Sequence, residues 1–303
     1  MKRKDILGIK DLSKAEIDEI LSTADVMRDM IDRSERGSGL RGKNVATLFY
    51  ENSTRTRNSF ELAAKNLGAT TTSISVATSS VQKGETLVDT GMTLDSIGMD
   101  VMIIRHSVAG SAHLLASTVK AHVINAGDGM SEHPSQAFLD GLTALRRFGS
   151  VAGKKVVIVG DIKHSRVARS DVMLFSALGA KVTVCAPYTL LPEGMDSLGC
   201  EVETDFDRAI EHAGIVIPLR VQRERMSGAF FASTEEYHSY YGVTNERLSR
   251  CERDYMVMHP GPINRGVEID GDVADGEHSY ILEQVKNGVA VRMAMLQLLA
   301  AES

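Results

Sequence analysis

Short apolar segments alternate with amphipathic segments along most of the chain, and this alternation constrains the fold more than any other feature. Residues 44–51 (NVATLFYE) and 154–162 (KKVVIVGDI) have the apolar runs typical of buried strands. After the first run, apolar residues recur at helical spacing, at Phe60, Ala63 and Leu67. Strands that alternate with helices predict parallel sheets with helices packed on their faces. We therefore expect an α/β fold.

The length of 303 residues favours two domains, each with a core of its own. The rhythm of strands and helices restarts near Pro134, which occupies a position where a first helical turn accepts proline. We expect one domain at 1–132 and a second at 133–284, each a parallel sheet flanked by helices. A last helix at about 285–303 is apolar enough to pack back on the first domain.

Charge and hydropathy exclude several classes of function. The net charge of −6 argues against a general affinity for nucleic acid or acidic membranes. The N-terminus turns polar early, and no apolar run approaches the roughly 20 residues that a membrane helix needs. We expect a cytoplasmic protein with no nucleic-acid partner and no membrane. Cys185, Cys200 and Cys251 are widely spaced, without a Cys-x-x-Cys pair, and are interpreted as reduced core thiols rather than metal ligands.

The segment ENSTRTRNSF at residues 51–60 places two arginines at a predicted strand-to-helix turn. A helix N-terminus offers unpaired N–H groups and a partial positive charge, which together suit a phosphate. The alternative is that Ser53 or Thr54 only caps the helix while Arg55 and Arg57 lie solvated on its surface. A Walker loop is absent from the sequence, so hydrolysis of a nucleoside triphosphate is not expected.

The chain resembles the aspartate carbamoyltransferase family over most of its length. Seven segments carry this resemblance in the family's order, and they are FYENSTRTRNSFE, SSVQKGETLVDT, IIRHS, EHPSQAFLD, GDIKHSR, LRVQRER and MHPGPINRGVEI. The resemblance implies a phosphate-binding domain followed by an aspartate-binding domain, with the active site between them. It implies transfer of the carbamoyl group of carbamoyl phosphate to the amine of L-aspartate, in de novo pyrimidine (UMP) biosynthesis. It also implies a homotrimer with active sites shared between subunits, and no cofactor or metal.

The resemblance further implies which residues bind carbamoyl phosphate, and these are Ser53, Thr54, Arg55, Thr56, Arg105, His133, Gln136, Pro260 and Gly261. The implied catalytic residues are Arg55, Thr56, Arg105 and His133. Thr56, Arg105 and His133 would surround the carbamoyl oxygen and stabilise the oxyanion of the tetrahedral centre. Gln136 and the backbone carbonyls near Pro260 would take the carbamoyl NH2 group.

Arg166, Arg220 and Gln222 are the aspartate ligands that the resemblance implies. A planar guanidinium matches a carboxylate bidentately, and aspartate carries two carboxylates. Without the motif context these residues would more often be ordinary surface side chains. Ser79 and Lys83 lie in a polar, glycine-bearing segment that reads as a loop, and in the family this loop reaches the neighbouring subunit's site.

Three rival functions are open at this point. A related transcarbamoylase acting on ornithine or another amine would share the phosphate motif, although LRVQRER favours a carboxylate-bearing acceptor. A nucleotide-binding oxidoreductase is disfavoured because Gly160 stands without the Gly-x-Gly-x-x-Gly pattern. A non-catalytic anion-binding α/β protein would show the same sequence features. Regulatory chains or other pathway enzymes are further partners that the resemblance allows.

Overall fold

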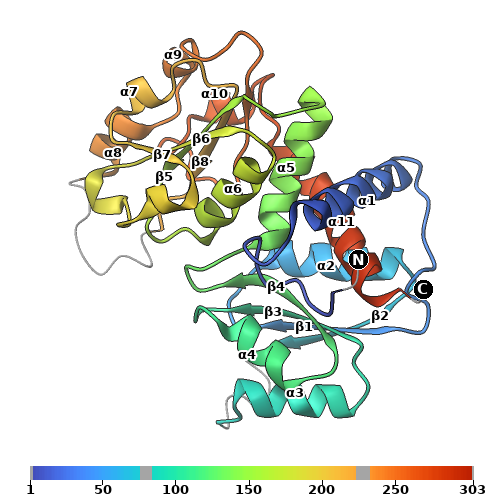
Figure 1. Cartoon of the computed structure of the whole chain (residues 1–303). Helices are drawn as coiled ribbons and strands as arrows, with labels where there is room; N and C mark the ends of the chain where they lie inside the picture. Colours follow the sequence, from blue (N-terminus) through green and yellow to red (C-terminus); the bar gives the residue numbers. More distant parts are fainter. Residues whose placement is uncertain (1–2, 76–83, 223–232, 302–303) are drawn as a thin grey trace. The chain divides into compact units, whose positions relative to one another are not determined.

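The computed structural model describes residues 3–75, 84–222 and 233–301 (Figure 1). The chain divides into two compact units: unit 1 comprises Met1–Leu142 with Lys286–Ser303, and unit 2 comprises Thr143–Val285. The division falls inside α5 (Pro134–Phe148) and near the start of α11 (Ile281–Ala300), whereas the sequence pattern predicts the first boundary before α5, after residue 132. The two boundaries differ because a helix that is continuous through a boundary carries no signal of it in its sequence pattern.

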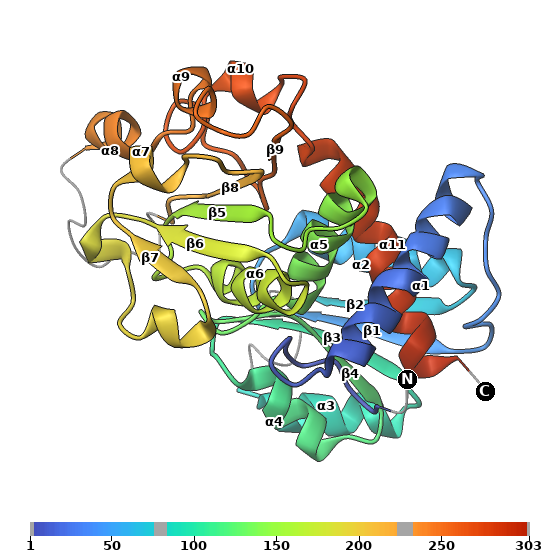
Figure 2. The ribbon, with the colours of Figure 1, turned by 45° about the horizontal axis from the view of Figure 1, so that its top comes forward.

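Unit 1 is built on a four-stranded parallel sheet. Its strands, in spatial order, are β2 (Thr70–Ser75), β1 (Asn44–Phe49), β3 (Val101–His106) and β4 (His122–Asp128). Its helices, besides parts of α5 and α11, are α1 (Lys14–Asp32), α2 (Thr54–Asn66), α3 (Leu87–Ser96) and α4 (Ser111–Thr118). Figures 1 and 2 show α3 and α4 on one face of the sheet, with α1, α2 and α11 on the other.

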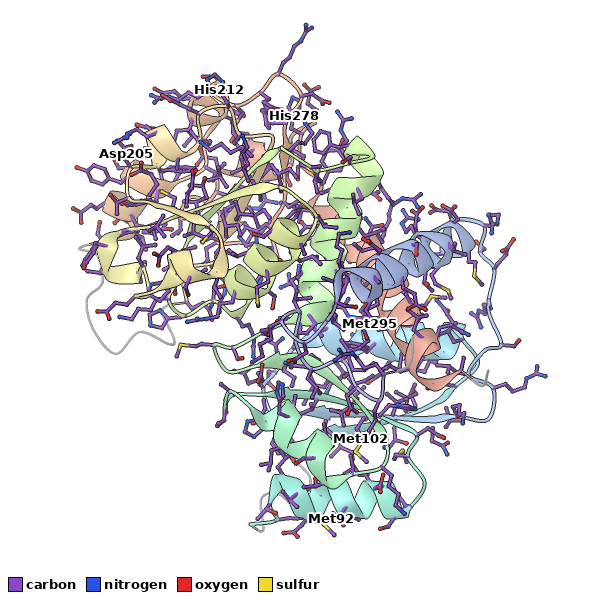
Figure 3. All side chains as sticks on the ribbon, viewed as in Figure 1. Met92, Met102, Asp205, His212, His278 and Met295 are labelled. Atoms are coloured by element: carbon purple, nitrogen blue, oxygen red, sulfur yellow. The ribbon has the colours of Figure 1, made fainter. Side chains whose placement is uncertain are left out.

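The core of unit 1 forms where helices pack on both faces of the sheet. Met102 of β3 lies among residues of α3 and α4, and Met295 of α11 is likewise fully buried. Met92, in contrast, is exposed on α3 (Figure 3). At the start of α1, Ser13 and Glu16 form the reciprocal capping box that the Ser-x-x-Glu pattern predicts.

Unit 2 is built on a five-stranded parallel sheet. Its strands, in spatial order, are β7 (Glu201–Glu203), β6 (Lys181–Cys185), β5 (Lys155–Gly160), β8 (Ile215–Leu219) and β9 (Met256–Val257). Its helices, besides parts of α5 and α11, are α6 (Arg166–Ala177), η3 (Tyr188–Leu190), η4 (Met195–Leu198), α7 (Phe206–Ala209), α8 (Thr234–Tyr241), α9 (Asn245–Leu248) and α10 (Gly271–Ala274). Consecutive residues of β5 enter different apolar clusters, so this strand is buried on both faces, as its continuous apolar run predicts. The expected α/β fold with two parallel sheets is confirmed.

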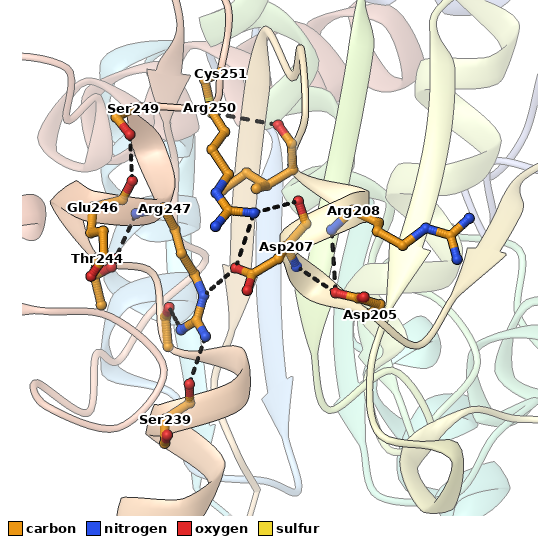
Figure 4. Close-up of polar contacts among 12 residues, drawn as sticks. Asp205, Asp207, Arg208, Ser239, Thr244, Glu246, Arg247, Ser249, Arg250 and Cys251 are labelled. Atoms are coloured by element: carbon orange, nitrogen blue, oxygen red, sulfur yellow. Dashed lines mark hydrogen bonds and ion pairs between the residues drawn. The ribbon is translucent and has the colours of Figure 1, made fainter.

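One arginine ties together the short helices at the edge of unit 2. The Nε atom of Arg247 donates to Asp207 at 3.0 Å, and its two Nη atoms donate to the carbonyls of Gly242 at 2.8 Å and Ser239 at 2.6 Å (Figure 4). The first residue of α7, Phe206, lies beneath the guanidinium, 5.6 Å from ring centre to Cζ. These contacts hold α7, α8 and α9 together, and they involve none of the predicted site residues.

The three cysteines are free thiols, with Cys185 and Cys200 buried and Cys251 half-buried. Burial raises the pKa of Cys200 to about 11 and that of Cys251 to about 12, so both thiols stay protonated near neutral pH. The expectation of reduced core thiols agrees with this burial. Among the described residues, no cluster of His, Cys, Asp and Glu side chains is arranged to hold a metal ion. In the same ranges, no helix is both long and apolar enough to cross a membrane.

Candidate functional site

The phosphate-type motif lies where β1 ends and α2 begins. Ser53 is the N-cap residue of α2, with extended backbone angles (φ −156°, ψ 96°), but its side chain makes no capping hydrogen bond to the helix. The first turn of α2 carries no acidic residue, while Arg55 is exposed and Thr56 is buried. A helix N-terminus at the carboxyl end of a parallel sheet is a favourable place for an anion. Ser53 thus occupies the N-cap position without a side-chain cap, while the exposure of Arg55 fits both an anion site and a solvated arginine.

Arg105 lies beside this motif because β3 is the neighbour of β1 in the sheet, with Arg105 opposite Phe49. The Nη1 atom of Arg105 donates to the carbonyl of Ala126 at 3.3 Å, and Nε lies 3.5 Å from a carboxylate oxygen of Glu51. The backbone N–H of Tyr50 donates to the Arg105 carbonyl at 2.9 Å. The contacts with Ala126 and Glu51 thus hold the guanidinium at the carboxyl end of the sheet, beside the turn at residues 51–56.

His133 and Gln136 occupy the start of α5, which follows β4 at the same edge of the sheet. Both side chains are buried, and the backbone N–H of Gln136 donates to the His133 carbonyl at 3.0 Å. The side-chain Nε2 of Gln136 donates to both carboxylate oxygens of Asp140, at 3.1 Å and 3.2 Å. The predicted site residues of unit 1 therefore gather at the carboxyl end of its sheet, after strands β1, β3 and β4. They are Ser53, Thr54, Arg55, Thr56, Arg105, His133 and Gln136.

A further charged residue, Arg292 of α11, lies behind these helices and is only 4% exposed. Its Nη1 donates to the hydroxyl of Ser59 in α2 at 2.9 Å, and its Nη2 donates to the hydroxyl of Ser135 in α5 at 3.3 Å. Burial, opposed by the charge of Asp140 and assisted by that of Arg55, lowers the pKa of Arg292 to about 9. Sequence reasoning missed Arg292 and Asp140. The signal for Arg292 was a lone arginine in the apolar segment VAVRMAMLQLL.

The predicted aspartate ligands lie at the carboxyl end of the sheet of unit 2. Gly160 and Leu219, the last residues of β5 and β8, are paired in register, so the segments that follow them are neighbours. Arg166 is the first residue of α6, buried at 4% exposure, and Ser165 caps this helix by accepting from the N–H of Ala168. Arg220 follows β8 directly. The structure thus places both arginines after adjacent strands.

Gln222 is held on the segment that connects β5 to α6. Its backbone N–H donates to Asp161 Oδ2 at 3.2 Å, and its side-chain Nε2 donates to the carbonyl of His164 at 3.2 Å. Asp161 Oδ1 also lies 2.8 Å from Nδ1 of His164. Because the NH2 end of the Gln222 amide is engaged, Oε1 remains as the end that can accept a hydrogen bond from a ligand.

Pro260 and Gly261 lie on the loop that follows β9. The side chains of His259 and Glu268 make hydrogen bonds that hold this loop. The Gly261 N–H donates to Nδ1 of His259 at 2.8 Å, so this nitrogen is the unprotonated one. The other ring nitrogen, Nε2, then donates to Glu268 Oε1 at 3.2 Å, and the same oxygen accepts from the N–H of Asn264 at 2.6 Å. These bonds fix the backbone of the loop and hence the direction of its carbonyls.

Two predicted residues, Ser79 and Lys83, lie outside the described residues. Unit 2 also contains an open cavity of about 1340 Å³ beside β6 and β7, lined by Tyr188, Leu191, Met195 and Glu203 among others. None of the predicted site residues lines it. The cavity is therefore separate from the candidate site.

Comparison with known proteins gives concordant results for the two halves of the chain. Residues 4–146 match the family model described as the aspartate/ornithine carbamoyltransferase carbamoyl-P binding domain, and residues 152–299 match the Asp/Orn binding domain of the same family. The aspartate carbamoyltransferase catalytic subunit of Acetivibrio thermocellus is 53% identical over 300 residues, which cover 99% of this chain and 96% of that protein.

Solved structures show the same relationship. The aspartate transcarbamoylase of Trypanosoma cruzi in complex with carbamoyl phosphate and aspartate superposes with a TM-score of 0.88 at 30% identity, covering 98% of this chain and 97% of that one. The ornithine carbamoyltransferase of Pyrococcus furiosus also has a TM-score of 0.88, at 28% identity and with the same coverage of both chains. The fold is thus common to aspartate and ornithine carbamoyltransferases. The relative with 53% identity is an aspartate carbamoyltransferase catalytic subunit.

Proposed function

Because the chain belongs to the aspartate/ornithine carbamoyltransferase family, we propose that the residues gathered in its two units bind the two substrates of carbamoyl transfer and carry out the reaction. The chain is a transferase that moves the carbamoyl group of carbamoyl phosphate to the amine of L-aspartate, giving N-carbamoyl-L-aspartate and phosphate.

Unit 1 binds carbamoyl phosphate. The phosphate occupies the N-terminus of α2, where first-turn N–H groups, the Ser53 hydroxyl and the Arg55 guanidinium converge on an anion. The absence of an acidic residue from the first turn of this helix favours the same ligand. The observation that supports this most directly is the N-cap geometry, because a serine that only capped the helix would donate or accept within it.

The carbamoyl group lies beside the phosphate. Thr56, Arg105 and His133 polarise the carbamoyl oxygen and stabilise the oxyanion that forms when the carbon becomes tetrahedral. Removing one such donor typically costs about 2.7–4 kcal/mol of transition-state stabilisation. Gln136 Oε1 and the backbone carbonyls near Pro260 accept hydrogen bonds from the carbamoyl NH2 group.

Unit 2 binds L-aspartate. Arg166 and Arg220 follow adjacent strands and bind the two carboxylates, because a guanidinium fork fits a carboxylate bidentately. Gln222 presents Oε1 as an acceptor, which suits the α-amine of aspartate and holds it with its lone pair free to react. Two arginines in this half favour aspartate over ornithine, whose side chain ends in an ammonium group.

The reaction uses positioning and charge stabilisation rather than a covalent enzyme intermediate. The neutral amine attacks the carbamoyl carbon, the bond to the phosphate oxygen breaks, and the departing phosphate takes the proton from the amine. Holding two reactants in attack geometry can supply roughly 7–11 kcal/mol of the barrier. The two substrates must be in contact for the carbamoyl group to transfer, so catalysis draws on residues of both units.

We also propose that the chain works in the cytoplasm as a homotrimer, in the synthesis of pyrimidines (UMP), with Ser79 and Lys83 completing the site of a neighbouring subunit. Refolding a mixture of Lys83→Ala and Arg55→Ala chains tests this arrangement. Hybrid trimers should contain some interfaces with both wild-type residues, so activity should exceed that of either parent. Hybrids as inactive as their parents would show that Lys83 serves its own chain.

The transfer reaction is tested by measuring ureido product with carbamoyl phosphate as donor and L-aspartate or L-ornithine as acceptor. We expect product with aspartate and at most a trace with ornithine. Product with ornithine alone would contradict the aspartate assignment, and binding of carbamoyl phosphate without product from any amine would point to an anion-binding protein.

A further inference from the structure

A buried polar network connects the three helices behind the phosphate half of the site. Arg292 of α11 donates to Ser59 in α2 and to Ser135 in α5, at 2.9 Å and 3.3 Å. Phe60 of α2 lies under the guanidinium, 5.0 Å from ring centre to Cζ. The two helices whose first turns carry the predicted carbamoyl phosphate ligands are therefore linked through one arginine.

Asp140 is the anionic member of this network. Its side chain is fully buried one turn after Gln136 on α5, and its charge acts on Arg292. A buried carboxylate without compensation would take up a proton, because burial disfavours the charged form. The neighbouring guanidinium favours the ionised carboxylate, which accepts hydrogen bonds and donates none.

The carboxylate of Asp140 determines which way the Gln136 amide faces. Both carboxylate oxygens accept from Gln136 Nε2, at 3.1 Å and 3.2 Å. The opposite orientation of the amide would bring its carbonyl oxygen against the carboxylate, where two acceptors repel. The NH2 end is therefore fixed on Asp140, and Oε1 is the end left for a ligand that donates.

We propose that Asp140, whose two carboxylate oxygens both accept from Nε2 of Gln136, is a positioning residue that selects the acceptor end of Gln136 for the NH2 group of carbamoyl phosphate. This inference rests on the proposed function of Gln136. Neither Asp140 nor Arg292 touches the substrate. The network also explains Gly288 of α11, since a Cβ at this position would lie 2.6 Å from Nη1 of Arg292 and would displace the guanidinium from Ser59.

A double-mutant cycle on Asp140 and Gln136 separates positioning from a general structural role. In Asp140→Asn the new amide can turn either end toward Gln136, so the orientation is lost. We expect the KM for carbamoyl phosphate to rise about tenfold, the size of effect expected for one lost hydrogen bond to a ligand, while the KM for aspartate stays within about twofold. In a Gln136→Ala background, Asp140→Asn should add less than about a twofold change, because there is no amide left to orient.

The matched control is Asp95→Asn, which replaces a carboxylate of unit 1 that accepts from the N–H groups of Lys120 and Ala121. We expect this variant to keep the wild-type KM for carbamoyl phosphate. Thermal unfolding of each variant shows whether it is folded, and Asp140→Glu, which retains an acceptor-only group, provides a second variant should Asp140→Asn fail to fold. Asp140→Glu should then keep KM closer to wild type than Asp140→Ala does.

The outcomes distinguish this inference from the proposed function. If wild-type protein forms carbamoyl-aspartate and the effects of Asp140→Asn and Gln136→Ala multiply in the double variant, Asp140 does not act through Gln136 and the inference is wrong. If Asp140→Ala and Asp140→Glu have equal KM values, the inference is likewise wrong. If wild-type protein forms no product and binds no carbamoyl phosphate by calorimetry, the proposed function itself fails, and the inference fails with it.

Discussion

His259 and Glu268 form a hydrogen bond of 3.2 Å inside unit 2, with both side chains essentially inaccessible to solvent. The carboxylate oxygen in this bond also accepts from the backbone N–H of Asn264, so one side chain holds two points of the loop that carries Pro260. Its partner His259 holds a third point through the N–H of Gly261.

Glu268→Leu should therefore damage both stability and activity. It leaves the Nε2–H of His259 and the N–H of Asn264 without an acceptor, and each buried unpaired donor costs about 1–3 kcal/mol. Glu268→Gln keeps an acceptor and should lose less than half as much. Thermal unfolding and the transfer assay measure both effects, and equal losses in the two variants would contradict this role of Glu268.

Arg55→Ala should lower kcat/KM for carbamoyl phosphate roughly ten- to hundredfold, the loss expected for one charge-assisted hydrogen bond to the phosphate. Arg57→Ala is the matched control on the same helix, and we expect it to change kcat/KM by less than about threefold. Steady-state kinetics at saturating aspartate measure both variants. Equal and small losses would remove Arg55 from the phosphate site.

Arg220→Ala should raise the KM for aspartate at least about tenfold and leave carbamoyl phosphate binding nearly unchanged, because Arg220 lies in unit 2 and the proposed phosphate ligands lie in unit 1. Initial rates at varied aspartate give the first quantity, and calorimetric titration with carbamoyl phosphate gives the second. Loss of carbamoyl phosphate binding with an unchanged KM for aspartate would reverse our assignment of the two units.

Glu132 makes the stability of the protein depend on pH. Burial at 3% exposure raises the pKa of this carboxyl to about 7, against a reference value of 4.5, although the N–H of Ile9 donates to it. The folded protein therefore binds more protons than the unfolded chain between these two values. The contribution of Glu132 to stability should fall by about 3 kcal/mol as pH rises through this window, and stay constant above it.

Glu132→Gln removes this titration. Urea unfolding at pH 5, 6, 7 and 8 should show the stability of the wild type falling relative to that of the variant up to pH 7, with no further divergence at pH 8. Glu193→Gln, which replaces an exposed carboxylate of unit 2, is the control and should track the wild type. A difference between wild type and Glu132→Gln that is the same at every pH would show that Glu132 is ionised throughout.

The sequence predicts those parts of the site that depend on local order along the chain. The turn from β1 into α2 lies within a few residues, so its strand pattern, its serine and its arginines could all be recognised together. Arg105 and His133 could be predicted as ligands only through resemblance, because their proximity depends on the order of strands in the sheet.

The apolar segment around Arg292 marks this arginine as unusual, but the sequence does not show that it interacts with Asp140. An acid on α5 and an arginine on α11 reveal nothing by spacing, since Asp140 acts on Arg292 only once the chain has folded. The boundary between the units was hidden for a related reason, because α5 continues through it with an unbroken helical pattern.

The position of α11 has a consequence for protein synthesis. Ribosomes translate the α11 residues from Lys286 onward after every residue of unit 2, yet these residues belong to unit 1. During synthesis, the aspartate half can fold as soon as residue 285 has emerged, whereas the carbamoyl phosphate half still waits for Arg292. The half-site for aspartate can therefore form before the half-site for carbamoyl phosphate. The nascent chain can bind carbamoyl phosphate only after α11 has left the ribosome.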